Sequence, residues 1–159
     1  MKSYIIHDKK QFMAALFTGD AFHHFFLKEL HIDTKITHVV DGRIHPEFYT
    51  SDERKEMAAE LSEYVLWSEV RPLAFDMIRG KKTPLRFTIV FLATPAEQIQ
   101  SDASAISYLN LTVRFENNTC HVISGCAYQT FSLDKDAEKE WDNALATFLS
   151  SHQISFEED

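Results

Sequence analysis

Five basic side chains gather in one short stretch of an otherwise acidic chain. They are Arg71, Arg79, Lys81, Lys82 and Arg86, and Asp76 is the only acid within these 16 residues. Arginine binds carboxylate and phosphate groups through two parallel hydrogen bonds, so Arg71 and Arg79 are suited to hold a small anionic ligand or an acidic protein partner. The alternative is a solvated helix end followed by the outer face of one strand.

The centre of this cluster, "RGKKTP" at residues 79–84, admits two interpretations. A phosphate-binding loop places several glycines directly before the amino end of a helix. Here one glycine, Gly80, follows an apolar helical pattern, two lysines come next, and Pro84 prevents the helix from continuing. These features are typical of a helix carboxyl end, where cations compensate the helix dipole. The sequence therefore predicts a helix terminus rather than a phosphate-binding loop.

A pocket beside the basic cluster is the second candidate site. Pro72 interrupts a long helical pattern and should kink or split the helix, because proline lacks an amide hydrogen and clashes with the preceding turn. We expect a ligand pocket between this kinked helix and a sheet, with the basic cluster at its mouth. Its expected lining is Tyr64, Trp67, Arg71 and Tyr108.

Histidine and cysteine do not assemble into a predicted metal site or nucleophile. Four histidines recur every seven residues from His24 to His45, but turn residues interrupt this region, so they do not share one helix. Cys120 and Cys126 are separated by about 20 Å of predicted strand, which is too far for a disulfide. Cys120 and His121 point to opposite faces of that strand, and a buried thiol is a weak nucleophile. We expect no metal and no cofactor.

Composition and charge narrow the class of protein. The chain of 159 residues is long enough for one domain, residues 1–159, with its own hydrophobic core. A net charge of −8 disfavours nucleic acids and anionic membranes as partners. The four glycines are far apart, which excludes a glycine-rich nucleotide loop. No apolar run approaches the ~18 residues of a membrane span, and reduced cysteines fit a cytoplasmic location.

The amino-terminal part of the chain predicts a short helix and then a strand. The helix runs from Asp8, which can cap it, to about Phe17, and Gly19 ends it. Residues 22–30 are ambiguous, because their aromatic side chains suit one helical face or a strand. We expect a turn near residue 20 and a strand over residues 24–32.

A second strand and a long helix follow. The strand, residues 36–40, ends at Asp41-Gly42, a dipeptide typical of two-residue hairpins. A first hairpin turning at residues 33–34 would place His38 opposite Glu29. Residues 51–79 carry apolar side chains at steps of three and four, which predicts the helix that Pro72 interrupts.

The second half of the chain predicts three strands. Residues 85–93 are apolar on both faces, as expected of a strand covered on both sides. Residues 108–116 alternate strictly, and Asn117-Asn118 can adopt the positive φ angles of a two-residue hairpin. This hairpin pairs Phe115 with Cys120 and sends a strand back to about residue 131, with a bulge expected at Gly125.

The remaining residues complete the predicted fold class. A last helix covers residues 136–151, with an apolar stripe that includes Trp141, and the acidic tail at residues 155–159 is expected to be disordered. The predicted fold is α+β with the order αββαβββα. It has a mostly antiparallel sheet of about five strands with helices packed on it.

Three segments resemble a known protein family. They are "VDGRI", "WSEVRPLAFDMIRGKKTPLRFTIVF" and "WDNALATFL". The chain is similar, over about residues 4–150, to short cytoplasmic proteins of Gram-positive anaerobic bacteria that form a domain of unknown function. The resemblance implies a self-contained domain, and it carries no assigned activity, ligand or catalytic residue.

Two functions from different classes remain open. The first is a non-catalytic interaction or assembly module that binds a protein partner or a second copy of the chain. Trp67 and Trp141 lie on helical stripes and are expected in the core, and either could instead anchor a dimer contact. The second is a small-ligand-binding protein or enzyme that takes an anion in the pocket near Pro72. The first is favoured, because the sequence contains no catalytic motif.

Overall fold

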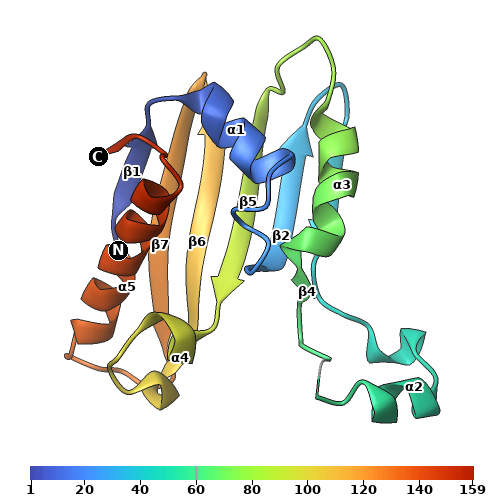
Figure 1. Ribbon diagram of the computed structural model, residues 1–159, viewed down its shortest axis with the longest axis vertical. Helices are drawn as coiled ribbons and strands as arrows, with labels where there is room; N and C mark the ends of the chain where they lie inside the picture. Colours follow the sequence, from blue (N-terminus) through green and yellow to red (C-terminus); the bar gives the residue numbers. More distant parts are fainter. Residues whose placement is uncertain (60) are drawn as a thin grey trace.

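Eight strands form one antiparallel sheet in the computed structural model, which describes residues 1–59 and 61–159 (Figure 1). The sheet order is β3-β2-β5-β6-β7-β1-β8, and β4 pairs with the first residues of β2. The strands are β1 (Ser3–Ile6), β2 (Phe26–Asp33), β3 (Thr37–Asp41), β4 (Val65–Leu66), β5 (Arg86–Ala93), β6 (Ile106–Glu116), β7 (Thr119–Tyr128) and β8 (Phe156–Glu158). The helices are α1 (Lys9–Phe17), α2 (Ser51–Glu56), α3 (Trp67–Ile78), α4 (Pro95–Gln98) and α5 (Asp136–Ser151), with short 3-10 turns at Pro46–Phe48 and Ala103–Ala105.

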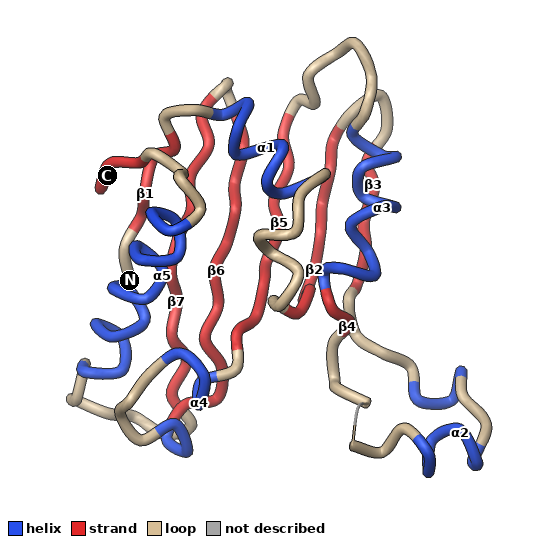
Figure 2. The backbone as a smooth tube through the Cα atoms, in the orientation of Figure 1, coloured by secondary structure: helices blue, strands red, loops and turns tan. Residues whose placement is uncertain are grey.

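The helices α1, α3 and α5 lie on one face of the sheet (Figures 1 and 2). Alternate residues of β6 from Leu109 to Phe115 are buried beneath this helix layer, whereas Arg114 is exposed on the other face. The expectation that residues 85–93 are covered on both sides holds only near the end of the strand. The helix layer covers one face, and on the other face Thr88 and Val90 are half-buried whereas Leu92 is buried.

Aromatic rings fill the space between the helices and the sheet. Phe22 is fully buried, with its ring centroid 5.8 Å from that of Phe12 on α1 and 5.2 Å from that of Phe148 on α5. Trp67 and Trp141 are also enclosed, which confirms that both belong to the core. Edge-to-face contacts of this kind stabilise the core beyond the burial of apolar area.

The predicted helices at the two ends of the chain are confirmed. The Asp8 carboxylate accepts a hydrogen bond from the Gln11 backbone N–H at 3.0 Å, so Asp8 caps α1 as expected. Helix α5 covers residues 136–151, and its apolar stripe packs on β7 and the core.

The long helix predicted over residues 51–79 is wrong. It is replaced by α2, an irregular segment, β4 and α3; residue 60 lies outside the described residues. Pro72 does not split the helix, because it lies inside α3, which is continuous from Trp67 to Ile78. The helical pattern is interrupted earlier, where Val65 and Leu66 pair with the beginning of β2. Strand pairing with a distant segment therefore overrides local helical periodicity.

The dipeptide Asp41-Gly42 does not form the predicted hairpin. Gly42 instead continues along β2, where its N–H donates to the Lys28 carbonyl at 2.9 Å. A side chain at position 42 would meet the Leu27 carbonyl oxygen at 1.8 Å, so only glycine fits this close approach. The strands β2 and β3 turn over residues 34–36, which places His38 opposite Ile32 rather than Glu29.

The hairpin between β6 and β7 follows the prediction. Asn117 and Asn118 have φ angles of 52° and 59°, and Phe115 pairs with Cys120. Pairing continues without a shift at Gly125, and the irregularity of this ladder lies near the beginning of β6 instead. The strand ends at Tyr128, three residues before the predicted end.

The α+β class and the antiparallel sheet are confirmed, whereas the strand number and element order are wrong. The sheet has eight strands rather than about five, and β1, β4, β8, α2 and α4 extend the predicted order αββαβββα. The tail at residues 155–159, expected to be disordered, includes β8, which pairs with β1. These strands contain two to four residues, too few to show a periodic pattern of their own.

Candidate functional site

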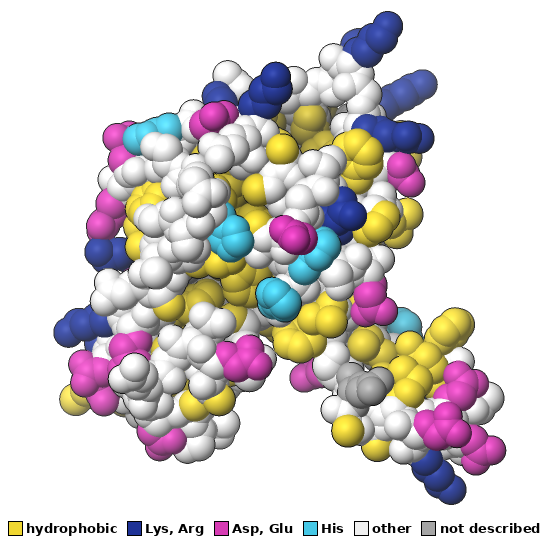
Figure 3. Space-filling view, viewed as in Figure 1, with side chains coloured by type: hydrophobic (Ala, Val, Ile, Leu, Met, Phe, Trp, Pro, Cys, Tyr) yellow, Lys and Arg dark blue, Asp and Glu magenta, His cyan; other side chains and the backbone are white. Residues whose placement is uncertain are grey.

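A groove lies between α1 and the carboxyl end of α3, and we call it the basic groove. It has a volume of about 750 Å³. Its lining comprises Lys10, Met13, Ala14, Phe17, Thr18, Phe75, Ile78 and the loop residues 79–84. The apolar side chains form its floor and four cations its rim. Figure 3 shows Lys and Arg side chains gathered over this end of the molecule.

The loop at residues 79–84 is a helix terminus, as predicted. Helix α3 ends at Ile78, the Arg79 N–H donates to the Phe75 carbonyl at 2.9 Å, and Gly80 has a positive φ of 147°. Strand β5 follows rather than a helix. The loop therefore does not lead into the amino end of a helix, and its positive charge comes from side chains.

The structure brings together three of the five predicted cations. Arg79, Lys81 and Lys82 line the basic groove. Arg71 instead donates to the Phe17 carbonyl at 2.7 Å and to His23 Nε2 at 3.1 Å, so it joins α3 to α1 and the following turn.

Arg86 lies apart from the basic groove, at the start of β5. It pairs across the sheet with Asp33 at 2.9 Å and with Glu116 at 3.6 Å. It therefore neutralises two carboxylates and adds little to the field of the groove.

The ligand pocket predicted near Pro72 does not form with its predicted lining. Trp67 is buried under α1, where its Nε1–H donates to the Leu16 carbonyl at 3.0 Å. Tyr64 and Tyr108 do meet, but in a separate pocket of about 300 Å³ with Lys28. These side chains come together at the end of the sheet next to β4.

A projecting segment, residues 43–59 and 61–64, is the second surface feature, and we call it the arm. It leaves the sheet after β3 and returns at β4, as Figure 1 shows. Its stem is held by the hydrogen bond from the Ile44 N–H to the Glu63 carbonyl and by a bridge between Arg43 and Tyr64. Helix α2 lies near its tip, with Thr50 as the capping residue.

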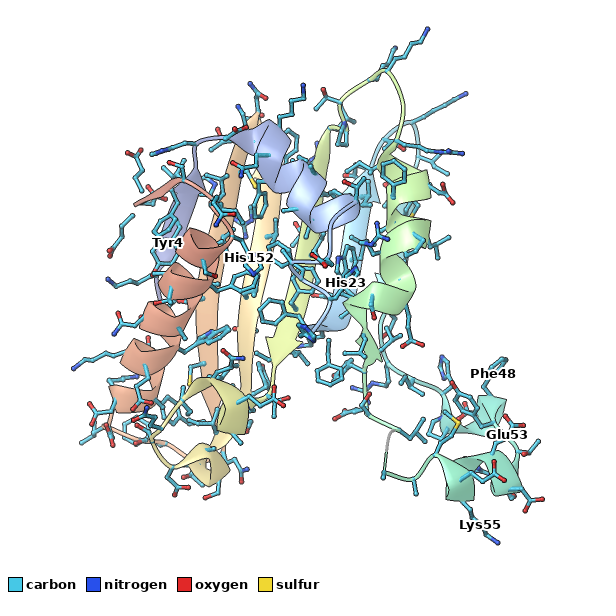
Figure 4. The ribbon with its side chains drawn as sticks, viewed as in Figure 1. Tyr4, His23, Phe48, Glu53, Lys55 and His152 are labelled. Atoms are coloured by element: carbon cyan, nitrogen blue, oxygen red, sulfur yellow. The ribbon has the colours of Figure 1, made fainter. Side chains whose placement is uncertain are left out.

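The arm exposes a large aromatic side chain. Phe48 is 82% exposed, and its only described aromatic contact is the neighbouring Tyr49, at 5.3 Å between ring centroids. Figure 4 shows Phe48 and Lys55 projecting from opposite sides of the arm. A notch of about 510 Å³ separates Phe48 from Val40 and other apolar residues at the sheet edge. Exposed apolar surface of this kind is typical of a protein contact.

A third site, which we call the central pocket, was not predicted. It has a volume of about 410 Å³ and lies between α5, α4 and the turn before β2. Its lining comprises Asp20, Ala21, His24, Phe25, Ala93, Thr94, Glu97, Gln98, Trp141, Phe148 and His152. Figure 3 shows histidine side chains beside hydrophobic surface over the middle of the molecule, and Figure 4 shows His152 there.

The two cysteines are free thiols that differ in burial. Cys120 is buried and burial raises the pKa of its thiol to about 12, which confirms that it is a weak nucleophile. Cys126 is also free. Within residues 1–59 and 61–159, no three His, Cys, Asp or Glu side chains converge as metal ligands, and no helix has the length and apolar character to cross a membrane.

Comparison with known proteins identifies the family but no activity. No curated protein and no solved structure matches the chain. Residues 15–157 match a family of unknown function, DUF5721. This range includes the arm, the central pocket and the basic groove, except for three groove residues, Lys10, Met13 and Ala14. Since the match covers most of the sequence, the chain belongs to this family of unknown function.

Proposed function

We propose that the protein is a non-catalytic assembly module that forms a homodimer, in which the arm of each copy occupies the basic groove of the other. The observation that carries this proposal is the complementarity of the two surfaces. The arm presents the exposed Phe48 among acidic residues, and the basic groove presents an apolar floor within a cationic rim.

Charge supports this pairing. The described residues of the arm include five acidic and three basic residues, whereas the lining of the basic groove contains four basic residues and no acid. Only Arg79 has an ion pair within the described chain, with Asp76 at 3.4 Å, and Lys10, Lys81 and Lys82 have none there. Complementary potentials of this kind favour encounter and fix the orientation of two partners.

The position of the two surfaces favours contact between copies. The arm joins the amino end of α3 through β4, and the basic groove lies at the carboxyl end of α3. Twelve helical residues span about 18 Å, so an arm cannot fold into the groove of its own copy. When two copies exchange arms, each groove is filled by the arm of the other copy, and the dimer is closed by two-fold symmetry.

The edges of the sheet suggest how the copies align. β8 is short and carries Glu157 and Glu158, and like charges of this kind discourage pairing between copies. β3 is the other edge, and its central residue Val39 is 60% exposed. Antiparallel pairing of two β3 strands about Val39 would bring Asp41, next to the arm, opposite Thr37 of the second copy.

This alignment directs each arm to the required groove. The turn before Thr37 is joined to the basic loop, because the Leu85 N–H donates to the Asp33 carbonyl at 2.9 Å. The arm of one copy therefore approaches the loop at residues 79–84 of the other.

The expected dimer is moderate in affinity and sensitive to salt. Burial of one phenylalanine contributes about 2 kcal/mol, and each surface ion pair adds about 0.2–1 kcal/mol. Both contributions occur twice in a two-fold symmetric dimer. Association itself costs about 4–15 kcal/mol, so neither the arms nor the β3 edges are sufficient alone. Added salt should weaken the ion pairs and shift the protein toward monomer.

Analytical ultracentrifugation over a concentration series tests the proposal. Phe48→Ser and the double variant Lys81→Glu/Lys82→Glu should each shift the equilibrium toward monomer. Phe131→Ser and Lys139→Glu are the matched controls, since Phe131 is 90% exposed and both positions lie outside the arm and the basic groove. These controls should sediment like the unmodified chain.

A charge swap makes the test specific. The variant Asp52→Lys/Glu53→Lys reverses charge on the arm, and it should be monomeric, as should Lys81→Glu/Lys82→Glu. An equal mixture of these two variants should form a heterodimer, because each arm then meets a groove of opposite charge. A mixture that stays monomeric, or an unmodified chain that is monomeric at millimolar concentration, would contradict the proposal.

A small anionic ligand is the second candidate for the same groove. Its apolar floor and cationic rim suit an acyl chain with an anionic head, and about 750 Å³ is adequate for a molecule of this size. A thermal-shift screen with acyl phosphates and sugar phosphates tests it, because a ligand at 100 times its Kd stabilises by about 2.7 kcal/mol. A shift abolished by Lys81→Glu/Lys82→Glu would support this candidate over the dimer.

The cellular setting is part of the proposal. We propose one domain over residues 1–159, located in the cytoplasm of Gram-positive anaerobic bacteria, with neither nucleic acid nor membrane as a partner. The free cysteines and the net charge of −8 support this setting. Fractionation of cells that produce the protein at its natural level tests the location.

A further inference from the structure

We propose that the central pocket binds a small organic cation, an amine or quaternary ammonium with an apolar body. This site is separate from the arm and the basic groove, and the proposal does not depend on the dimer. It is carried by four exposed polar side chains at the pocket that have no side-chain partner among the described residues, together with the aromatic side chains that line it.

The histidines of the chain divide into two groups. Six of the eight contact a polar partner. They are His7, His23, His31, His38, His45 and His121. The imidazole side chains of the other two, His24 and His152, make no hydrogen bond or ion pair to the described residues, and both residues line the central pocket. Two unpaired imidazoles from segments 128 residues apart thus meet at one cavity.

Two carboxylates of the central pocket are also unpaired. Asp20 and Glu97 line it from opposite sides, from the turn before β2 and from α4. Neither side chain makes a hydrogen bond or an ion pair with residues 1–59 or 61–159. The nearby Glu140, by contrast, is occupied by the Ser101 hydroxyl and the Gln100 N–H. The mouth of the pocket is therefore negative when its histidines are neutral.

The floor of the central pocket is aromatic and held in place. Trp141 donates from Nε1 to the Asn110 carbonyl at 2.9 Å, and the Phe148 ring lies 4.7 Å from the imidazole of His152. Phe25 also lines the floor, with its ring 5.2 Å from that of Phe148. Phe148 is the half-buried ring of the three, whereas Phe25 and Trp141 are enclosed beneath it. Aromatic rings attract organic cations and accept their apolar bodies. A negative mouth above an aromatic floor therefore selects cations over anions.

Arg71 does not neutralise the charge of the Asp20 and Glu97 carboxylates. Arg71, which contacts His23 next to His24, does not line the pocket, and its guanidinium is directed to the Phe17 carbonyl and to His23. The charged and titratable groups that face a ligand are thus Asp20, Glu97 and the two histidines, His24 and His152.

Three matched probes test the proposal by NMR titration of the full-length protein. Phenethylamine is cationic, phenethyl alcohol neutral and phenylacetate anionic, and their apolar bodies are nearly the same. Phenethylamine should bind at least about tenfold more tightly than the other two and shift the amide signals of residues around His24, Glu97 and His152. Benzyltrimethylammonium should compete with it.

Variants assign the effect to the pocket. Asp20→Asn/Glu97→Gln should lower the affinity for phenethylamine by about tenfold, and Glu69→Gln, an exposed carboxylate outside the pocket, should leave it unchanged. Thermal melts confirm that each variant is folded.

Several results would overturn the proposal. One is equal or tighter binding of phenylacetate or phenethyl alcohol. Another is a set of shifted amide signals that lies outside the central pocket. The third is unchanged affinity in Asp20→Asn/Glu97→Gln, and the last is no binding by either cation.

Discussion

Replacement of Gly42 by alanine should destabilise the protein strongly, because Gly42 is the point where the arm leaves the sheet. The added Cβ would lie 1.8 Å from the Leu27 carbonyl oxygen and 2.7 Å from its carbon, and both are backbone atoms that cannot rotate away. The chain would have to move off β2. This movement would stretch the hydrogen bonds from the Gly42 N–H to Lys28 and from the Val65 N–H to Gly42, each 2.9 Å long.

The cost of Gly42→Ala follows from these contacts. Two backbone hydrogen bonds contribute about 1 kcal/mol each, and overpacking adds about 1–3 kcal/mol, so the free energy of unfolding should fall by about 3–5 kcal/mol. For a domain of this size, such a change lowers Tm by roughly 10 °C. The variant should also reduce dimer formation, since the stem of the arm is displaced.

Urea unfolding followed by tryptophan fluorescence measures this change, because Trp67 and Trp141 are buried. Gly125→Ala is the matched control. Its added Cβ would lie 1.9 Å from Asn110 Oδ1, a side-chain atom that has no hydrogen-bond partner and can rotate away. This control should cost about 1 kcal/mol or less. A Gly42→Ala variant within 1 kcal/mol of the unmodified protein, or a Gly125→Ala variant with the same loss, would refute the reasoning.

Three further predictions concern the core, a turn and a helix contact. Cys126 should react with a maleimide faster than Cys120 in the folded protein, because burial raises the pKa of the Cys120 thiol to about 12; equal rates would contradict this. Asn118→Ala should lower stability by about 1–2 kcal/mol in a urea titration, since Asn118 has a positive φ, whereas Asn118→Gly should not. Hydrogen bonds from Ser101 and Gln100 lower the pKa of the Glu140 carboxyl, so its contribution to stability is present at neutral pH and lost as it gains a proton. Glu140→Gln should therefore lower Tm at pH 7, and the difference should shrink below about pH 4.

Local patterns predicted the elements whose causes are local. Asp8 caps α1, the apolar stripe of α5 sets its length, and Asn117-Asn118 determines the register between β6 and β7. The helix terminus at residues 79–84 also follows from neighbouring residues, since Gly80 and the residues around it act within one turn. In each case the deciding interactions join residues a few positions apart.

Wrong predictions arose where a distant segment decided the structure. Val65 and Leu66 fit a helical pattern, but β2 captures them as a strand. Asp41-Gly42 has the composition of a turn, but the approach to Leu27 keeps it extended along the sheet. Pairing across the sheet provides hydrogen bonds for backbone N–H and C=O groups. A local sequence pattern cannot show which distant segment supplies these bonds.

The sequence by itself determined the α+β class, the central hairpin, the two terminal helices and the reduced, buried state of Cys120. Only the tertiary structure decided that Arg79, Lys81 and Lys82 share a groove while Arg71 and Arg86 do not, and that His24 meets His152. The physical reason is the distance along the chain over which the deciding interactions act. Periodicity and capping act within one or two turns of chain, whereas a site is formed by the packing of helices across a sheet, which depends on the whole core at once.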